Sequence, residues 1–566
     1  IGFASARYEF TDWLTLQLRA GTDYYTTRQT DWDDERTPHL GRPGRINERE
    51  WRIREDNYDF LLMFNETIGS DFTVSANLGG NRLSQKREDL RISGQEFIIP
   101  GLRDISNTAF PSVGYGISEK KINSLYGSAQ IGYRDYLFLD VTARNDWSST
   151  LPDENNSYFY PSASLSFAFT DAFDMGSDIL SFGKVRASYA EVGGDTDPYQ
   201  LDLTYRIVGQ PFQGSPQGEI TQGRIPLNSL RPTNTVSYEA GVDLRFFGNR
   251  LGIDFALYDM TTTDQILSTN ISNTSGYGSV TVNAGEIKNT GIELLVTGTP
   301  LQTNDFRWDV ALNLARNENT VNALDDDGKL EALRLGESRA RNAYVEARID
   351  QPYGAIVGRA YTRDDQGRIV HDADGLPIQG DLELLGVGVP DLISGLTNTF
   401  SYKGMTLSFL VDARFGGQIH SNTNRFLYSA GHHINTLEGR EEFYAGTGGY
   451  VGEGVNEAGE VNTVAVDPEI YFGTVANQIA EEFIYDADFV KLRQATLTYR
   501  FPQRIFDSTP IQGLTLSVVG RNLWIISSNV PNVDPESNYN STNAQGLEYS
   551  SFPTTRSFGV NLNVKF

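Results

Sequence analysis

The residues that could do acid–base, metal or nucleophilic chemistry are few and scattered. The histidines are His39, His371, His420, His432 and His433. None of them stands in a metal-ligand spacing such as HExxH. The pair His432–His433, with His420 near it in sequence, could hold a metal on a loop, but a solvated loop is the simpler interpretation. SEKK at 118–121 matches Ser-x-x-Lys by letters, yet it leads into a strand, whereas a nucleophile of that kind opens a helix. The sequence therefore predicts no enzyme and no resident metal.

Acidic turns offer one further metal candidate. DDDG at 325–328, RDDQG at 363–367 and HDADG at 371–375 are the richest in aspartate. Asp372, Asp374 and Glu383 stand at positions 1, 3 and 12 of an EF-hand-like loop, but Pro377 occupies position 6, where glycine is needed. Ordinary Asp-Gly turns are the favoured interpretation, and calcium in these loops is the one cofactor that the sequence leaves open.

Aromatic residues in the long connections are better candidates for binding. A flat ring offers apolar area to a sugar face or a peptide at a low cost in side-chain entropy. The candidates are Trp147, Tyr199, Tyr277, Tyr428, Tyr444, Tyr450 and Tyr539. The alternative for any one of them is that it packs against its own loop or belongs to a ring of interfacial aromatics.

The elements that must carry these residues are strands. Along 556–566, Phe558, Val560, Leu562, Val564 and Phe566 alternate with polar residues or glycine. DFRWDVALNLAR at 305–316 and YEAGVDLRF at 238–246 alternate in the same way, with charges of both signs on the polar face. Roughly seventeen such segments occur, most about 9 to 13 residues long, which is the length that a tilted strand needs to cross a bilayer.

Composition agrees with an all-β membrane protein. The chain has 28 Tyr, 31 Phe, 55 Gly and no Cys, so it is rich in strand and turn formers and has no disulfides. Its mean hydropathy is −0.37, and no run approaches the roughly 18 apolar residues that a spanning helix needs. The net charge of −26 and the lack of a basic cluster argue against a nucleic-acid partner.

The connections distinguish a barrel from a soluble sandwich or propeller, which would also alternate. Short links, such as Gly69-Ser70, Gly248-Asn249-Arg250 and Lys403-Gly404, take turns with long ones. The long links are 26–49, 82–119, 148–158, 192–234, 264–282, 318–392, 417–487 and 525–555. This order places all tight turns at one end of the strands, as in a transmembrane antiparallel β-barrel of the bacterial outer membrane, with short periplasmic turns and long extracellular loops.

Within that barrel the polar face becomes the lumen wall. Its predicted charged members are Arg144, Arg186, Glu239, Asp243, Arg245, Asp254, Arg307 and Asp309. Their mixed signs favour no one substrate. Phe566 ends the last strand at the periplasmic edge, where it resembles the terminal aromatic mark that the barrel-assembly machinery reads. An odd number of strands that starts on a downward strand predicts that further strands precede Ile1.

Several stretches resemble the C-terminal part of the SusC/RagA group of TonB-dependent transporters. ARNDWSSTLP at 143–152 and YFYPSASLSFAF at 158–169 are similar to the family's Arg-x-Asp-Gly-Ser-Ser segment and Phe-Pro-Ser strand, with Trp147 in place of the glycine. NAGEIKNTGIELLV at 283–296 resembles its Asn-x-Gly-x-x-x-Asn-x-Gly-x-Glu pattern. The ordered C-terminal block is DADFVKLRQATLTYRFP at 486–502, GLTLSVVGRNLW at 513–524, VDPES at 533–537 and PTTRSFGVNLNVKF at 553–566.

The resemblance implies a 22-stranded barrel, of which this chain supplies about 17 strands over 1–566, and an N-terminal plug that is not recognisable here. It also implies a SusD-like surface lipoprotein as partner, TonB as the source of energy, and oligosaccharides or peptides as cargo. We expect the loops at 192–234, 318–392 and 417–487 to seat the lipoprotein and to form part of the ligand chamber. A passive porin and a barrel that serves as a scaffold in a surface or secretion complex are the alternatives.

Overall fold

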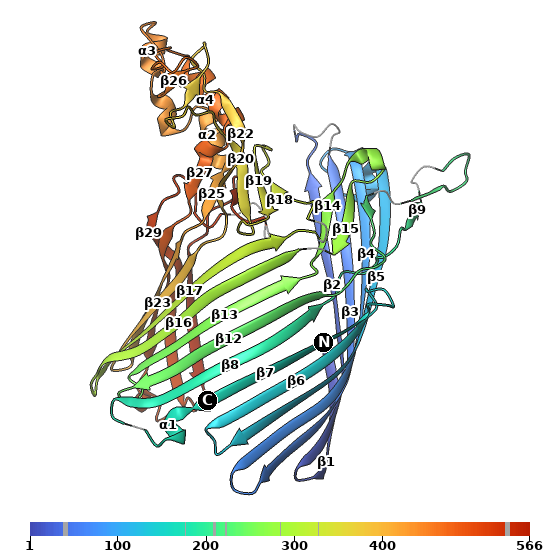
Figure 1. The fold of residues 1–566 in the computed structure, drawn as a ribbon, viewed down its shortest axis with the longest axis vertical. Coiled ribbons are helices and arrows are strands. Elements are labelled where there is room, and N and C mark those ends of the chain that lie inside the picture. The colour runs from blue at the N-terminus through green and yellow to red at the C-terminus, as the bar shows by residue number, and fades with distance from the viewer. Residues whose placement is uncertain are drawn as a thin grey trace. The chain divides into compact units, whose positions relative to one another are not determined.

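The computed structural model describes residues 1–37, 44–175, 177–207, 211–220, 223–283, 285–325, 328–537 and 544–566. The chain divides into two compact units, drawn as ribbons in Figure 1. The first consists of Ile1–Phe167, Ala187–Ser237 and Thr262–Ala284, and the second of Ala168–Arg186, Tyr238–Thr261 and Gly285–Phe566. Within the described residues, no helix has both the length and the apolar content needed to span a membrane.

The main sheet has 17 strands, as many as the sequence predicts, and the pairs of main-sheet strands within each unit are antiparallel. Its strands are β1 (Gly2–Thr11), β2 (Leu14–Asp33), β3 (Arg45–Ile68), β4 (Phe72–Phe97), β5 (Thr108–Tyr133), β6 (Leu137–Ser148), β7 (Ser157–Ala168), β8 (Leu180–Gly194), β12 (Thr233–Phe246), β13 (Leu251–Thr263), β16 (Glu286–Gln302), β17 (Phe306–Ala323), β23 (Leu392–Tyr402), β24 (Met405–Phe415), β28 (Phe489–Arg500), β29 (Gly513–Ser528) and β31 (Ser557–Lys565).

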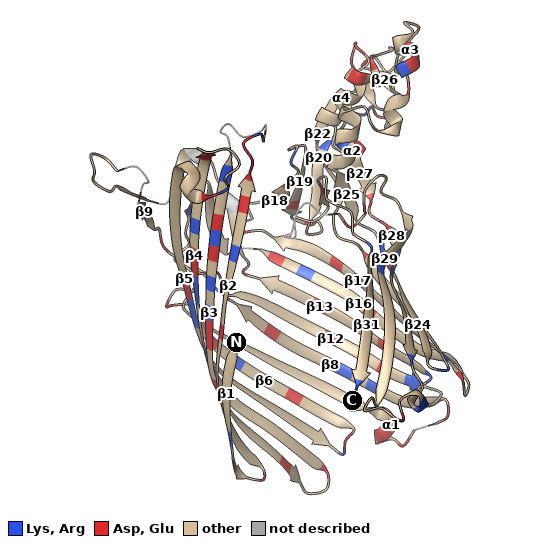
Figure 2. Cartoon of the chain, turned by 180° about the vertical axis from the view of Figure 1, so that it is seen from behind, with Lys and Arg blue, Asp and Glu red and all other residues tan. Residues whose placement is uncertain are grey.

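In the first unit, β1 to β7 pair in chain order, each strand with the next. Strands β2 to β5 are 20 to 26 residues long, well beyond the predicted length. The predicted connections at 26–49 and 82–119 are therefore largely strand, and the prediction of long loops there was wrong; 38–43 lie outside the described residues. The apolar alternation fades in these stretches because opposite charges, such as Arg28–Glu48 at 2.7 Å, replace apolar pairs across the strands (Figure 2).

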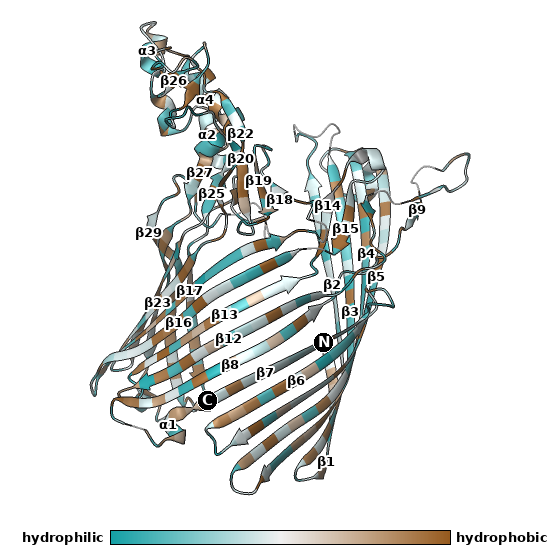
Figure 3. Ribbon diagram, in the orientation of Figure 1, coloured by the Kyte–Doolittle hydropathy of each residue, from teal (hydrophilic) through white to brown (hydrophobic). Residues whose placement is uncertain are grey.

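In the second unit, β16, β17, β23, β24, β28, β29 and β31 pair in that order. One row of directly paired residues crosses six of these strands, namely Trp308, Phe400, Leu407, Leu497, Val518 and Val560. The row that starts one residue earlier, on the opposite face, is Arg307, Ser401, Thr406, Thr498, Ser517 and Asn561. Apolar and polar residues alternate accordingly along the ribbons of Figure 3.

Most of the apolar row is exposed, and none of it is buried. Leu407 is 42%, Leu497 45% and Val518 47% accessible. Leu562 of β31 pairs with Leu516 and lies on the same face, 60% accessible. A continuous apolar face that covers no core is what a wall of strands presents to lipid.

The tight turns lie where the alternation predicts them. Lys403-Gly404 links β23 and β24, and both residues have positive φ, 44° and 88°. A two-residue hairpin turn of this kind matches the twist of its strands. Of all residues, glycine adopts the backbone conformation of Gly404 with the least strain. Similar short links join β3 to β4, β5 to β6 and β12 to β13.

Smaller elements fill the remaining connections. In the first unit these are η1 (Ile105–Asn107), β9 (Tyr205–Ile207), β10 (Gly218–Ile220), β11 (Arg224–Ile225), β14 (Ile266–Asn270), η2 (Asn273–Ser275) and β15 (Ser279–Asn283). In the second unit they are α1 (Phe169–Ala172), β18 (Ala332–Glu337), β19 (Ala343–Arg348), β20 (Ala355–Tyr361), β21 (Val370–His371), β22 (Gln379–Val387), β25 (Gln418–Ser421), α2 (Asn422–Ser429), η3 (Ile434–Leu437), α3 (Arg440–Tyr444), β26 (Val455–Asn456), α4 (Pro468–Gln478), η4 (Glu481–Phe483), β27 (Ile484–Asp486), η5 (Gln503–Ile505) and β30 (Leu547–Glu548).

Two of the predicted long loops, 318–392 and 417–487, fold together. We call Ala332–Val387 and Gln418–Asp486 the loop module. Strands β18, β19, β20 and β22 form one sheet in it, and α2 packs with α4. Its core holds Tyr361, Tyr428, Phe472, Val475 and Phe483, all less than 9% accessible. The loop module thus has a hydrophobic core of its own, which irregular loops do not have.

Candidate functional site

The loop module contains a pocket of about 290 Å³. The end of α2, η3, α3 and the start of α4 surround it. Its aromatic lining is Tyr428, Phe443, Tyr444 and Phe472, and its charged lining is Arg440, Asp467 and Glu469. Apolar rings together with a few polar groups are typical of small-molecule sites.

Local sequence signals place the helices around this pocket. Asp467 caps α4, because its side chain accepts a hydrogen bond from the Glu469 N–H at 2.9 Å, and Pro468 follows at the first helical position. Ser421 caps α2 by accepting from the Asn424 N–H at 3.2 Å. Both caps satisfy N–H groups that the first turn of a helix leaves free.

The wall of the pocket is a packed aromatic cluster. Tyr428 is 3% accessible and makes edge contacts with Phe472 and Phe483, at ring-centre distances of 5.7 and 5.1 Å. Its hydroxyl donates to Glu482 at 2.9 Å, and the Tyr361 hydroxyl donates to the other oxygen of that carboxylate at 2.9 Å. Burial, followed by the negative charge of Glu482, raises the pKa of Tyr428, so this phenol stays protonated and serves as a donor.

Arg440 is held in place by backbone carbonyls. Its guanidinium donates to the carbonyl oxygens of Thr436 and Gly431, at 2.5 and 2.6 Å. Tyr444, four residues further on, is 83% accessible. The arrangement offers the exposed ring of Tyr444 for stacking beside a partly charged pocket, and the pocket lining contains no nucleophile with an adjacent base.

The structure brings together some of the predicted aromatic residues and not others. Tyr428 and Tyr444 line the same pocket, and Tyr450 packs on Tyr471 and Phe472 of the same cluster, at 4.5 and 4.7 Å. Trp147, Tyr199 and Tyr277 belong to the first unit. The Tyr199 hydroxyl accepts a hydrogen bond from the Glu119 N–H of β5 at 3.2 Å. Tyr539 lies outside the described residues, as does His39.

The charged residues predicted on the polar face form ion pairs. Arg186 contacts Glu239 at 3.3 Å and Asp254 at 2.9 Å. The other pairs are Arg307–Asp309 at 2.7 Å, Arg245–Asp243 at 3.4 Å and Arg144–Asp146 at 2.9 Å. Paired charges leave this face polar but without a strong field of one sign.

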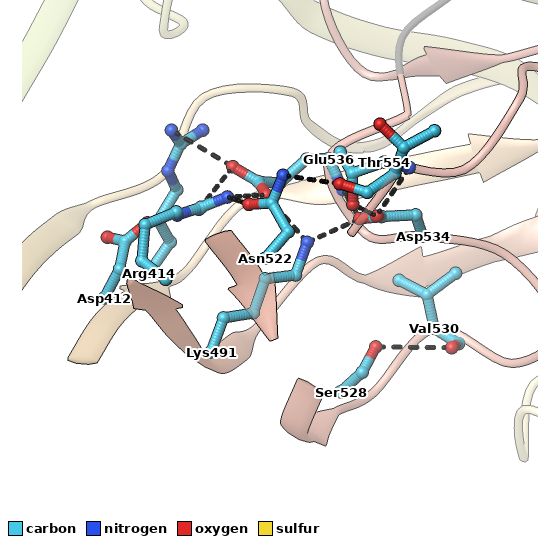
Figure 4. A network of polar contacts seen from close by, with 11 residues as sticks. Asp412, Arg414, Lys491, Asn522, Ser528, Val530, Asp534, Glu536 and Thr554 are labelled. Atoms are coloured by element: carbon cyan, nitrogen blue, oxygen red, sulfur yellow. Dashed lines mark hydrogen bonds and ion pairs between the residues drawn. The ribbon is translucent and has the colours of Figure 1, made fainter. Parts of the chain in front are cut away.

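A second polar cluster, which sequence reasoning missed, joins three of the C-terminal motifs (Figure 4). Lys491 of β28 is 3% accessible, and its ammonium contacts Asp534 at 2.6 Å and Glu536 at 2.7 Å. Thr554 donates its hydroxyl to Asp534. We call Asp412, Lys491, Arg493, Asp534, Glu536 and Thr554 the charged anchor.

Further bonds complete the charged anchor. Arg493 bonds to both oxygens of Glu536, at 2.8 and 2.9 Å, and to Asp412 of β24. Burial disfavours the charge of Asp534, but the hydrogen bonds from Lys491 and Thr554 outweigh it and lower the pKa of Asp534 to about 2. The charged anchor therefore ties Asp534, Glu536 and Thr554 to the sheet.

A β-bulge at Arg493 orients the β28 side chains of the charged anchor. On β24, Leu410 pairs with Gln494 and Val411 with Leu492, so Arg493 has no opposite residue. The extra residue shifts the alternation by one, which puts Lys491 on the polar side although Leu497 and Tyr499 lie on the apolar face. The sequence carries the signal, because apolar residues change from even positions (Val490, Leu492) to odd ones at this point.

The motif ARNDWSST holds a similar anchor in the first unit. Asp146 is 6% accessible and accepts from Arg144 at 2.9 Å and from the Tyr160 hydroxyl at 2.7 Å. Asp195 accepts from Lys120 at 2.7 Å and from Ser148 at 2.6 Å. These contacts attach the start of the 192–234 connection to β5 and β6.

The weak calcium candidates do not gather. Asp372 accepts the N–H groups of Asp374 and Leu376, at 3.0 and 2.9 Å, as in an Asp-Gly turn, whereas Glu383 lies on β22 opposite Gly358. Within the described ranges, no three His, Asp or Glu residues are placed to hold a metal ion. His420 is fully buried, and His433 caps η3 by accepting from the Asn435 N–H at 3.2 Å.

Comparison with known proteins identifies the sheet. The family described as "TonB dependent receptor-like, beta-barrel" matches residues 2–523. The chain belongs to this family. Its members are outer-membrane transporters and receptors rather than enzymes, which agrees with the exposed apolar face.

Individual relatives place the chain near the SusC group. TonB-dependent receptor P3 of Formosa agariphila is 26% identical over 486 residues, covering 80% of this chain and 46% of the relative. TonB-dependent receptor SusC of Bacteroides thetaiotaomicron is 25% identical over 458 residues, covering 76% of this chain and 42% of the relative. The chain thus spans about half the length of the curated relatives that it matches.

A solved structure shares the fold. The structure of the RagAB peptide transporter superposes with a TM-score of 0.79 at 20% identity, covering all of this chain and 61% of the other. The predicted likeness to SusC/RagA-type TonB-dependent transporters is confirmed.

Proposed function

We propose that the protein containing this chain imports oligosaccharides or peptides across the outer membrane, with energy supplied through TonB and with a SusD-like lipoprotein as partner. The observation that carries the proposal is the family match over residues 2–523. The exposed apolar face supports a wall in lipid, and the paired charges of the polar face support passage of cargo without selection by charge.

The loop module supplies the surface that the proposal needs outside the membrane. It has its own core, and its pocket carries an exposed ring at Tyr444 beside the fixed guanidinium of Arg440. We propose that Tyr444 stacks on a sugar ring or a peptide side chain as cargo approaches. The ring of Tyr428 belongs to the buried wall of the pocket and acts by supporting that site.

Uptake of labelled oligosaccharide and peptide tests the proposal. In cells that produce the full protein, uptake should require the proton-motive force, and a lipoprotein should co-purify in detergent. Tyr444→Ala should raise KM by about tenfold, the loss of one good stacking contact, while Tyr444→Phe, which keeps the ring, should change it little. Uptake that persists in de-energised cells, with no lipoprotein bound, would replace this proposal with a passive porin.

A further inference from the structure

Among the residues that the structure describes, no strand pairs with β5 between Pro111 and Ile117 on the side away from β4, and we call this stretch the free edge. β6 pairs with β5 only from Ile122 to Tyr133, whereas β4 pairs with β5 from Thr108 onward. Every residue from Ala109 to Ile117 is exposed. β6 then turns away at 149–156 into β7, so this edge arises inside the chain and not at one of its ends.

Two hydrogen bonds establish which backbone groups face outward. The Lys121 N–H donates to the Ser149 hydroxyl at 2.9 Å, and the Glu119 N–H donates to the Tyr199 hydroxyl at 3.2 Å, both on the side away from β4. The register with β4 is unbroken from Phe110 to Tyr133. In an antiparallel ladder alternate residues face the same side, so Val113, Tyr115 and Ile117 present both N–H and C=O to the free edge.

Pro111 agrees with this assignment. Pro111 is odd-numbered, like Val113, Tyr115 and Ile117, so its backbone nitrogen also faces the free edge. A proline has no N–H to donate to a neighbouring strand. The proline therefore leaves the backbone hydrogen bonds between β5 and β4 intact. The free edge has one N–H donor fewer at this position. Unpaired edge groups of this kind are a ready template for another strand.

The two faces beside the free edge differ in chemistry. On one face Val113, Tyr115 and Ile117 are 71%, 62% and 46% accessible. On the other face stand Gly114 and Gly116, and an added Cβ would meet nothing closer than 3.9 Å at Gly114 and nothing within 4 Å at Gly116. A strand added here would thus meet apolar side chains on one face and open space on the other.

Arginines border the open face. Arg91 pairs with Gly114 and Arg87 with Ser118, and both are exposed. The acid between them, Asp89, is bonded by Arg49 of β3. Because the glycines carry no side chains, the long stems of Arg87 and Arg91 can extend across β5 toward a neighbouring strand.

We infer that the β5 edge from Pro111 to Ile117 binds an extended segment of another protein as an added strand, and that this segment alternates apolar with acidic residues. Its apolar side chains would pack beside Val113, Tyr115 and Ile117, and its carboxylates would meet Arg87 and Arg91. Main-chain hydrogen bonds supply affinity in this mode, and alternate side chains supply specificity.

A second copy of this chain fits the edge less well. An antiparallel pair centred on Tyr115 would place Gly114 of one copy opposite Gly116 of the other. The arginines of both copies would then share one face, and like charges across a sheet are destabilising. The inference does not depend on the proposed import function, and its failure would leave that function standing.

The test uses the full chain in detergent and two fluorescent nine-residue peptides, one of alternating valine and glutamate and one of alternating valine and lysine. We expect binding of the glutamate peptide, measured by anisotropy. We also expect slower hydrogen exchange at the amides of Val113, Tyr115 and Ile117, while Gly114 and Gly116, already bonded to β4, are unchanged.

Two pairs of variants separate the backbone and charge contributions. Val113→Pro removes one outward N–H without touching the ladder to β4, as Pro111 shows, and should weaken binding about tenfold or more, whereas Val113→Ile should not. Arg87→Glu with Arg91→Glu should reverse the preference toward the lysine peptide. An added control, Arg54→Glu on the inner strand β3, should leave the preference unchanged.

Three outcomes would overturn the inference. The first is no protection of the three amides at about 1 mM peptide, where even millimolar affinity would be visible. The second is equal binding to the Val113→Pro variant, which would place the peptide elsewhere. The third is concentration-dependent dimerisation that Val113→Pro abolishes, which would assign the edge to a second copy of this chain.

Discussion

At the scale of single residues, the most consequential feature is a set of charges that are buried and mutually dependent. Lys491 and Asp534 are both 3% accessible at the side chain. A buried charge is tolerated only with its partner, because the energy of removing each ion from water must be offset by the contact between them. The motifs VKLR and VDPES thus have a structural explanation, which is attachment of a long connection to the sheet.

Lys491→Met should lower the free energy of unfolding by about 3 to 5 kcal/mol, because it leaves Asp534 buried without its cation. The matched control is Lys288→Met, since Lys288 contacts Asp259 at 2.8 Å with both side chains more than 40% exposed. We expect that control to cost less than about 1 kcal/mol. Urea unfolding in detergent measures both, and equal costs would show that burial of the charged anchor is unimportant.

His420 should make the loop module sensitive to acid. Burial, and then the nearby Arg425, lower its pKa from 6.5 to about 4. Between these values the unfolded chain binds a proton that the folded chain does not. Stability is therefore full above about pH 6.5 and falls toward pH 4, by up to about 1.4 kcal/mol per pH unit.

Calorimetric melting of the chain at pH 7, 6, 5 and 4.5 tests this dependence. His420→Leu removes one titrating group and should reduce the slope over that window, even where it lowers the melting temperature at pH 7. His432→Gln, at an exposed site of the same loop module, should leave the slope as it is. An unchanged slope in the His420→Leu variant would assign the acid response to other groups.

At the scale of elements, the alternation of side chains assigns a face to each strand. Leu562 shares the exposed apolar face with Leu516, and Asn563 pairs with Thr515 on the polar one. Leu562→Arg should destabilise the folded protein in lipid by about 2 to 4 kcal/mol near the midplane, because it places a cation among acyl chains. Asn563→Arg should be nearly silent. Unfolding in lipid vesicles compares them, and a larger cost for Asn563→Arg would reverse the assignment of faces.

The sequence showed the alternation of apolar and polar residues along the strands. It did not show how long each strand is, or what the change of face at a bulge does. The count of strands and the tight turns at Gly69-Ser70 and Lys403-Gly404 follow from period-two patterns and turn residues. Strands β2 to β5 were predicted too short because charged pairs stabilise a ladder without leaving an apolar signal. The bulge at Arg493 shows as a change of phase, yet the burial of Lys491 depends on Asp534, 43 residues away.

The candidate site was predictable only in part for a similar reason. Tyr428 and Tyr444 could be chosen as loop aromatics, but their assignment to one pocket depends on the packing of α2 and α4, which the sequence does not reveal. Arg440 was missed because a lone arginine in a polar loop resembles any solvated charge. Its role comes from the carbonyls of Gly431 and Thr436, which orient it.

At the scale of the whole molecule, the negative charge is unevenly distributed. The net charge is −26, and the segment Gln418–Asp486 alone carries eleven Asp and Glu against two Arg and no Lys. On the polar face of the strands, by contrast, acids and bases pair. The Gln418–Asp486 part of the loop module therefore carries a field of one sign, whereas the wall does not.

This distribution predicts that charge affects the approach of cargo more than its passage. For peptides of equal length, we expect the initial uptake rate at low salt to fall in the order cationic, neutral, anionic, with about tenfold between the extremes, because the field of the loop module attracts cations to it. Raising the salt shortens the Debye length to about 10 Å at 0.1 M and should compress that range. Replacing Glu441 and Glu442 by Gln should compress it at low salt too, whereas neutralising Arg307 and Asp309 together, as Gln and Asn, should not. A rate order that is the same at all salt concentrations would mean that contacts along the wall, not the field of the loop module, select the cargo.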